Sequence, residues 1–387
     1  MNKITKKWFV FFSVFLSFTG CTNIEKSNEL IVVDINQDYP KKEILLQDFM
    51  DVEYIVLETS DDFITQGVIL DIGEKYILAK NWYADGDIFI FDRKTGKGIR
   101  KFNKKGQGYG EYNYINQAIL DEEKNEIFIN STQLKKIFVY DLVGNFKRSF
   151  SHANESEFLE IHTYDENHLI CYDMSGYYRN GQKRDKKSYH WIISKENGHI
   201  TKDFHLPFET IQIPMIQEGD FIASASIASI IPNQKNWIIA DSSTDTIYHY
   251  SVKTDEITPF IVRTPSKKPV IFLTVAAITN EYYFMKSIKN TFDFAKRRGF
   301  PSTCLAYDRN EKVIYEIDVL NGDFIKSFQV DLYSNPVNNQ LITAYQTLQS
   351  PQLVEAYKKG ELTGKLKELV SSLNEESNPV IMVMKDK

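Results

Sequence analysis

An acidic and aromatic stretch early in the chain carries side chains that could bind a ligand. Trp82 and Tyr83 are followed closely by Asp85 and Asp87. An aromatic face can stack on a sugar ring while carboxylates bind hydroxyl groups, and ligand sites often combine an apolar platform with a few fixed polar groups. Asp-Gly-Asp is also ordinary turn chemistry. The stretch therefore predicts either a sugar-binding loop or a structural turn, and both interpretations stay open.

A second candidate ligand contact, Tyr109, lies in the glycine-rich stretch from Gly106 to Tyr112. This stretch is neither a phosphate-binding loop nor a dinucleotide fingerprint, because no Lys-Ser/Thr pair follows and strands, not a helix, flank it. We expect the glycines to supply positive φ angles for a tight crossing. Tyr112 is then expected to pack inside the fold.

Two polar segments add aromatic and basic side chains. The insertion at 174–187 contains Tyr177 and Tyr178 beside several Lys and Arg residues. Loops often carry binding residues, although a solvated hairpin tip is the alternative. Arg297 and Arg298 could bind an anionic group, or could belong to a local patch of salt bridges. These residues complete the set of candidate ligand contacts.

Motifs of known catalytic and cofactor sites are missing from the sequence. It has no GxSxG, no HExxH and no EF-hand loop. Histidine pairs six residues apart are more typical of strand ends than of metal ligands. The sequence therefore predicts no catalytic residue, no metal site and no cofactor.

The elements that must position these residues repeat along the chain. Short runs of aromatic and β-branched residues, each followed by a polar turn, end at Asp92, Asp141, Ser194, Ser251 and Asp308, which are 49 to 57 residues apart. Such runs are typical of antiparallel strands, and a repeat of several short strands at this period is typical of a β-propeller. Five repeats are visible before the ends of the chain are considered.

The two ends of the chain supply the remaining strands. Residues 30–35 and 52–57 are strand-like at the start, and residues 379–384 are strand-like at the finish. An unclosed ring leaves exposed strand edges. We therefore predict an all-β, six-bladed propeller over 30–387, closed by N- and C-terminal strands that share the sixth blade. Amphipathic periodicity within 340–375 predicts a short helical insertion packed on the propeller before a closing strand at 379–385.

The first 29 residues resemble an export segment. Three lysines precede the apolar run 8–18, and Thr19-Gly20-Cys21 has small residues where cleavage occurs. The pattern predicts a signal peptide at 1–20, lipidation of Cys21 and a polar tether at 21–29. A plain secretory signal is the alternative. Membrane attachment through Cys21 in the cell envelope follows, on either the periplasmic face or the cell surface.

Charge and cysteine content restrict the partners. Removal of residues 1–20 leaves 43 basic and 52 acidic residues, a net charge of −9. A negative chain without a basic block is a poor candidate for binding nucleic acid. Cys171 and Cys304 are expected to be free thiols, because no CxxC or dense cysteine pattern is present.

With these motifs in view, the chain resembles the six-bladed β-propeller lipoproteins of Bacteroidota, distant relatives of NHL-repeat propellers. The resemblance covers residues 30–387 and rests on Gly106 to Tyr112, where Tyr109 replaces a usual proline, on Tyr54 to Thr59, and on Asn378 to Val383. It implies the fold and an envelope location. It implies little chemistry, because the family has no single established activity.

Together these observations favour a binding module over an enzyme. We expect a monomeric, lipid-anchored propeller that binds a glycan, a peptide or another envelope protein through its loops. The alternative is a carbohydrate-active hydrolase or lyase, which needs titratable groups that converge over the channel. Fold alone does not decide between them.

Overall fold

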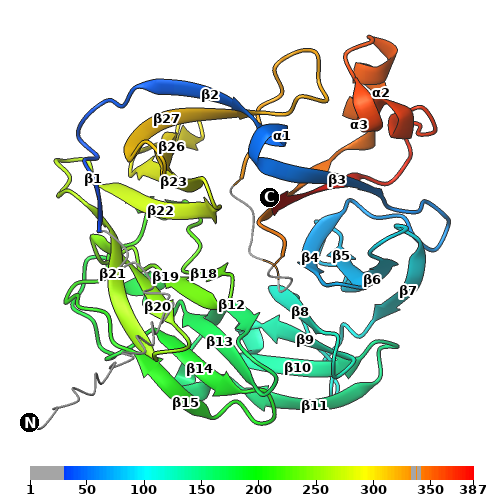
Figure 1. The fold of residues 1–387 in the computed structure, drawn as a ribbon. Helices are drawn as coiled ribbons and strands as arrows, with labels where there is room; N and C mark the ends of the chain where they lie inside the picture. The colour runs from blue at the N-terminus through cyan, green and yellow to red at the C-terminus, as the bar shows by residue number, and fades with distance from the viewer. Residues whose placement is uncertain (1–29, 333–336, 338–340) are drawn as a thin grey trace, which may run out of the picture.

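The computed structural model describes residues 30–332, 337 and 341–387. Their strands form six sheets arranged radially around one centre, which is the predicted six-bladed propeller (Figure 1). The expected signal peptide, Cys21 and the tether lie outside the described residues. We number the blades from the sheet that begins at β4.

Blades 1 to 3 are regular four-stranded antiparallel sheets in which sequential strands are neighbours. The first three strands of blades 1 and 2 are buried along nearly their whole length, because successive side chains point to opposite faces of the sheet and both faces pack against adjacent blades. Their strands are β4 (Val68–Ile72), β5 (Tyr76–Lys80), β6 (Asp87–Asp92) and β7 (Gly98–Asn103) in blade 1, β8 (Gln117–Asp121), β9 (Glu126–Ser131), β10 (Lys136–Asp141) and β11 (Phe146–Ser151) in blade 2, and β12 (Phe158–Thr163), β13 (His168–Asp173), β14 (His190–Ser194) and β15 (Ile200–Phe204) in blade 3.

Blades 4 and 5 each gain a fifth, parallel strand from the N-terminal segment. β1 (Ile31–Val33) pairs with the outer strand of blade 4, and β2 (Lys41–Leu45) pairs with that of blade 5. The other strands are β18 (Ile230–Asn233), β19 (Asn236–Ile239), β20 (Thr246–Ser251) and β21 (Glu256–Arg263) in blade 4, and β22 (Ile271–Ile278), β23 (Tyr282–Lys289), β26 (Ser302–Asp308) and β27 (Val313–Leu320) in blade 5.

The sixth blade closes the ring with both ends of the chain. It contains β28 (Ala344–Leu348), β29 (Val380–Asp386) and β3 (Met50–Val56), in that order. Closure by N- and C-terminal strands is therefore confirmed. The expectation that residues 30–35 also belong to this blade is wrong, because β3 already pairs with β29 along its full length and β1 instead covers the free edge of β21.

Short helices and hairpins decorate the ring. α1 (Leu46–Phe49) joins β2 to β3, while α2 (Ser350–Lys358) and α3 (Gly364–Val370) lie between β28 and β29, at the outside of the ring beside β3 (Figure 1). The region 340–375 thus also contains strand β28. The remaining elements are the hairpins β16 (Met215–Glu218) with β17 (Phe221–Ser224) and β24 (Phe292–Asp293) with β25 (Arg298–Gly299), and the 3-10 helices η1 (Thr132–Leu134), η2 (Ala153–Glu155) and η3 (Tyr177–Arg179).

The core is divided among the blade junctions. In the described part of the chain, six clusters of buried apolar side chains occur, one between each pair of adjacent blades. The cluster between blades 5 and 6 also includes Leu353, Leu366 and Val370, so α2 and α3 pack on the propeller as predicted. Cys171 and Cys304 are free thiols.

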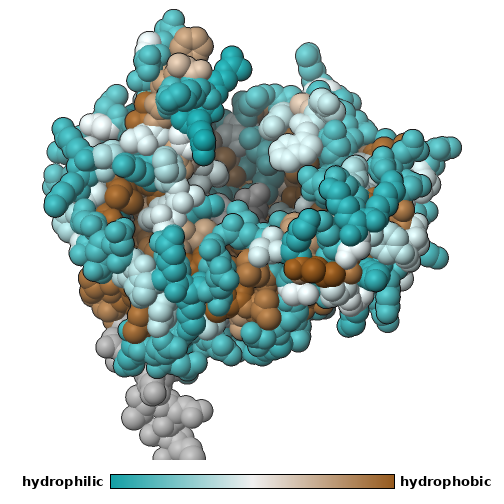
Figure 2. Space-filling model, turned by 90° about the horizontal axis from the view of Figure 1, so that it is seen from above, coloured by the Kyte–Doolittle hydropathy of each residue, from teal (hydrophilic) through white to brown (hydrophobic). Residues whose placement is uncertain are grey.

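The outer surface seen from the side is mainly hydrophilic. Figure 2 shows apolar side chains there only as small, separate patches among polar ones. Isolated apolar groups of this kind are normal on protein surfaces. The described residues on this side therefore present no broad apolar surface.

Candidate functional site

The connections between strands divide the propeller into two faces. In an antiparallel blade, the turns after the first and third strands leave at one end, and the turns after the second and fourth leave at the other. We call the end with connections 73–75, 122–125, 164–167, 234–235 and 279–281 the hairpin face. The opposite end, with connections 81–86, 132–135, 174–189, 240–245 and 290–301, is the loop face.

All the ligand contacts expected from the sequence lie at the loop face, but in different blades. The structure does not bring them into one site. Trp82, Tyr83 and Asp85 lie in the β5–β6 connection with Asp87 at the start of β6, Tyr109 in the β7–β8 connection, Tyr177 and Tyr178 in the β13–β14 connection, and Arg297 and Arg298 in the β23–β26 connection.

The two carboxylates of the first-blade loop are engaged within the loop itself. Asp85 accepts hydrogen bonds from the Asn81 side chain at 2.7 Å and from the backbone N–H of Asp87 at 3.1 Å. Asp87 accepts one from the Asn103 side chain at 2.9 Å and forms an ion pair with Lys101 at 2.8 Å. This arrangement is turn chemistry. Sugar binding by these carboxylates stays a prediction.

The aromatic rings of the loop face are exposed and separate. The side chains of Trp82 and Tyr83 are about three-quarters exposed, and Tyr109 is 93% exposed. Tyr109 touches only the edge of Phe146 among the aromatic rings, with centroids 5.2 Å apart. In the same stretch Tyr112 is fully buried and Gly110 has a φ of +74°, as the structural interpretation of the glycine-rich segment predicts.

The other two loop-face segments are held by the protein. In the 174–189 insertion, Lys186 forms an ion pair at 2.8 Å with the buried Asp173. The Ile211 N–H donates to the Gln182 carbonyl, and the Gly181 N–H donates to the Ile211 carbonyl. The insertion is therefore packed against the next connection and is not a free hairpin tip. Arg297 and Arg298 are exposed on the small β24–β25 hairpin, beside an ion pair between Lys296 and Asp293.

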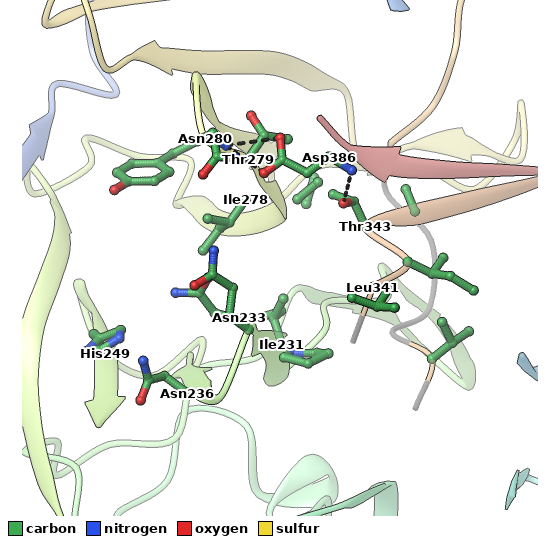
Figure 3. Close-up of a pocket in the computed structure, with 18 of the residues that line it drawn as sticks. Ile231, Asn233, Asn236, His249, Ile278, Thr279, Asn280, Leu341, Thr343 and Asp386 are labelled. Atoms are coloured by element: carbon green, nitrogen blue, oxygen red, sulfur yellow. Dashed lines mark hydrogen bonds between the residues drawn. The ribbon is translucent and has the colours of Figure 1, made fainter. Parts of the chain in front are cut away.

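A large cavity lies at the hairpin face, where the sequence predicted no ligand contact. Its volume is about 610 Å³, and it opens between blades 4, 5 and 6. Figure 3 shows side chains from the three blades arranged around this one space. The lining includes Ile231, Asn233, Gln234, Asn236, His249 and Phe260 of blade 4, Ile278, Thr279, Asn280, Tyr283 and Arg309 of blade 5, and Leu341, Thr343, Tyr345 and Asp386 around blade 6.

The charged groups of the cavity are used to join its walls. The Asp386 carboxylate accepts the backbone N–H of Asn280 at 2.9 and 3.1 Å, and the Asp386 N–H donates to the Thr343 hydroxyl (Figure 3). Burial raises the pKa of Asp386 above its ordinary value, and the Asn280 N–H and Arg309 oppose this shift. Arg309 donates to the carbonyls of Thr279 and Asn280 at 3.3 and 2.8 Å.

Neutral amides remain available to a ligand. The side chains of Asn233 and Gln234 have no hydrogen-bond partner among the described residues. The side-chain oxygen of Asn236 accepts the Val252 N–H at 3.1 Å, and the amino group of the same side chain can donate to a ligand. Each side-chain amide has one acceptor oxygen and two N–H donors. The cavity can therefore hold an uncharged ligand that both donates and accepts hydrogen bonds.

Polar side chains join the inner strands of blades 1 and 2, 2 and 3, and 3 and 4. Asp71 of β4 accepts the Leu120 N–H of β8 at 2.7 Å. Gln117 of β8 accepts the Ile161 N–H at 2.8 Å and donates to its carbonyl at 2.9 Å. In blade 3, Glu160 accepts the N–H groups of Ser229 and Ile230, at 2.8 to 3.1 Å. We call these contacts the inner-strand bonds. Among the described residues, none joins β18 to β22.

The residue that follows a shared β-bulge distinguishes the fifth blade from the first and third. The first strands of blades 1, 3 and 5 each skip one residue in their pairing, at Leu70, Leu159 and Ala276. A bulge re-aims the side chain beside it. The next residue is Asp71 in blade 1 and Glu160 in blade 3, and both make inner-strand bonds. In blade 5 the equivalent residue is Ala277, which cannot, and the cavity lies at this position.

Other kinds of site are not formed by the described part of the chain. No three His, Cys, Asp or Glu side chains of residues 30–332, 337 and 341–387 come together as metal ligands would. Among the same residues, no helix has the length and apolar character needed to cross a membrane.

Fold and cavity together define a six-bladed β-propeller with a large polar cavity between blades 4, 5 and 6. The chain belongs to the family described as a domain of unknown function, DUF4934, which matches residues 30–385. Among curated proteins, none matches this chain.

Two solved structures support the fold. A protein of Bacteroides fragilis, named as a candidate exported protein, is 16% identical, with a TM-score of 0.58 over 93% of this chain and 100% of that one. A member of the DUF4221 family from Bacteroides vulgatus is 8% identical, with a TM-score of 0.50 over 88% of this chain and 99% of that one. At these identities the likeness concerns the fold alone.

Proposed function

We propose that this protein is a non-catalytic binding module of the bacterial cell envelope that holds its ligand in the cavity at the hairpin face. The observation that carries the proposal is a cavity of about 610 Å³ whose unengaged polar groups are neutral amides. Ligand sites of proteins typically have volumes of about 300–1,000 Å³ with a few convergent polar groups. The cavity therefore suits a small ligand or one segment of a larger one.

The envelope location rests on two supports. The N-terminal pattern ending at Cys21 predicts export and lipidation. A structural neighbour of the same fold and nearly the same length carries a name that marks it as exported. The proposal includes membership among the lipid-anchored propellers of Bacteroidota and attachment to a membrane through Cys21. The proposed protein is monomeric and has no nucleic-acid partner.

A carbohydrate-active hydrolase or lyase is the weaker alternative. Most glycosidases need two carboxyl groups about 5 to 9.5 Å apart on either side of the scissile bond. Among the described residues that line the cavity, Asp386 is the sole carboxylate, and backbone N–H groups and Arg309 hold it in the wall. No observation favours catalysis over binding.

The test is a binding screen with the chain from Thr22 onward, which contains all described residues. The probes are a glycan array and a library of short peptides. The double variant Asn233→Ala, Gln234→Ala removes cavity amides that hold no other residue, and Trp82→Ala is the matched control on the loop face. We expect a saturable ligand whose binding falls in the double variant and persists in Trp82→Ala.

The opposite pattern would overturn this placement of the site. If binding persists in the double variant and falls in Trp82→Ala, the ligand occupies the first-blade loop. Release of shortened glycan products during the incubation would instead support the hydrolase or lyase alternative. Correct folding of each variant is checked by its thermal unfolding curve.

A further inference from the structure

We propose that the ligand of the cavity is a neutral oligosaccharide. This inference rests on the proposed function, because it names the ligand of the same site. Three features of the described lining carry it: its two charged side chains are engaged with backbone groups of the wall, the free polar groups match hydroxyls, and an apolar wall lies beside them.

Among the described residues that line the cavity, the two charged side chains are engaged with the backbone of its wall. Asp386 and Arg309 both hold the turn at Asn280, one through its N–H and the other through its carbonyl. Arg309 also lies over the ring of Tyr283, 4.9 Å from the centroid. Removing an ionic ligand from water is costly unless the site pairs its charge. A neutral ligand avoids this cost.

The free polar groups suit ligands in which every polar group both donates and accepts. Asn233 and Gln234 each present an acceptor next to donors, and the Asn236 amino group adds further donors. The Thr343 hydroxyl, which accepts the Asp386 N–H, keeps its own hydrogen to donate. A sugar hydroxyl is one donor and two acceptors at once. Neighbouring hydroxyls can therefore satisfy these amides in both directions.

An apolar wall lies beside these polar groups. Phe260 and Tyr283 meet edge to face with centroids 5.1 Å apart, and Ile231 and Ile278 line the same space. Arg309 lies over the Tyr283 ring and Tyr307 stacks on it, so the wall offers aliphatic groups and ring edges and no open aromatic face. Such apolar surface packs against the C–H groups of sugar rings, while polar groups around it fix orientation. A site of this volume holds a drug-sized ligand, which corresponds to roughly two or three sugar rings.

The geometry favours a compact ligand over an extended peptide. Peptides usually add along one strand edge, with side chains read at alternate positions. Here the polar groups come from the tips of separate segments: the β18–β19 turn, the β22–β23 turn and residue Thr343 (Figure 3). Convergence from three sides suits a ligand with hydroxyls around its whole perimeter.

The experiment compares matched neutral and charged ligands by isothermal titration calorimetry. Neutral di- and trisaccharides are titrated beside the corresponding uronic-acid or sulfated fragments and beside neutral tripeptides. We expect a neutral saccharide to bind with an affinity that does not change between low and high salt, because no ion pair contributes. We expect the double variant Asn233→Ala, Gln234→Ala to lower that affinity about tenfold or more.

Failure of this inference differs from failure of the proposed function. If only acidic saccharides or peptides bind, with loss in the double variant, the cavity is the site but the neutral-saccharide assignment is wrong. If no probe binds in a manner that depends on the cavity residues, both are overturned. Trp82→Ala serves as the control that retains the cavity.

Discussion

The junctions from blade 1 to blade 4 and the junction between blades 4 and 5 differ in how their inner strands meet. From blade 1 to blade 4, Asp71, Gln117 and Glu160 bind backbone groups of the next inner strand. Between β18 and β22, no described residue makes such a bond, and a cavity of about 610 Å³ opens beside this junction. The cavity thus coincides with the place where inner-strand bonds are missing among the described residues.

The same comparison separates stability from binding. A side chain that satisfies buried N–H groups cannot be removed without cost, whereas an amide that points into a solvent-filled cavity can. We call the junctions of blades 1 to 4, which have inner-strand bonds, the closed half, and the region of the cavity the open half. Substitutions in the closed half should change stability, and those in the open half should change binding.

The largest effect is expected at Glu160. Its carboxylate accepts the N–H groups of Ser229 and Ile230, both of which are buried. Glu160→Ala should lower the free energy of unfolding by about 3 kcal/mol, because two buried donors lose a charged acceptor. Denaturant titration measures the loss. Glu160→Gln, which keeps one acceptor oxygen, should lose less, and a change below about 0.5 kcal/mol in the alanine variant would contradict the account.

The next effect is a pH dependence at the junction of blades 2 and 3. The Phe158 N–H donates to Nδ1 of His152, and Nε2 lies 2.9 Å from the Asn130 side-chain oxygen. Burial lowers the pKa of His152 to about 4, against about 6.5 in an unfolded chain. A lowered histidine pKa gives stability that is complete above about pH 6.5 and is lost as the pH falls toward 4.

This histidine alone should therefore lower the free energy of unfolding by about 3 kcal/mol between pH 7 and pH 4. An NMR titration of the imidazole gives the pKa directly, and unfolding at several pH values gives the slope. His152→Gln should flatten that slope. An observed His152 pKa at or above 6.5 would show that the ring is not held neutral by this junction.

A smaller loss is expected at Gln117. This side chain bonds both backbone groups of Ile161, at 2.8 and 2.9 Å. Gln117→Ala should cost about 2 kcal/mol, less than Glu160→Ala because the lost bonds are neutral. Thermal and denaturant unfolding measure the change. Gln117→Glu is a useful companion, because it keeps the acceptor for the Ile161 N–H and loses only the donor. If the alanine variant were as stable as the parent protein, Gln117 would not stabilise the junction of blades 2 and 3.

The smallest effect on stability is expected in the open half. The double variant Asn233→Ala, Gln234→Ala removes amides without partners in the described chain, so the free energy of unfolding should change by no more than about 0.5 kcal/mol. Binding should nevertheless fall. A loss of more than about 2 kcal/mol would mean that these side chains support the fold, and the division between the two halves would fail.

The sequence predicts the blades well because strand patterns are local. Aromatic and β-branched runs that end at Asp92, Asp141, Ser194, Ser251 and Asp308 are enough to place the third strand of blades 1 to 5. The closing strand is also predictable, since unpaired runs at the two ends of a ring must meet. The place of β1 is not, because its partner Ile261 lies 230 residues away from Ile31 and any free outer edge could accept it.

The cavity could not be predicted for a related reason. Asn233 and Asn236 stand in a short polar turn that has the composition of any hairpin. What distinguishes this region is Ala277, at the position held by Asp71 and Glu160 in other blades, and that equivalence becomes visible only once the bulges are known. Trp82 suggests a binding site because of its residue type. In the structure, however, the loop that carries it is a hydrogen-bonded turn.

Hydrogen–deuterium exchange with and without a bound neutral oligosaccharide tests whether the cavity at the hairpin face is the ligand site. The account predicts new protection in the β18–β19 turn at 233–236, in the β22–β23 turn at 279–281 and in residues 343–345, which line the cavity on its three sides. The loop-face segments at 82–87, 106–112 and 174–187 should be unchanged. Protection confined to those loop-face segments, with the three cavity segments unaffected, would contradict it.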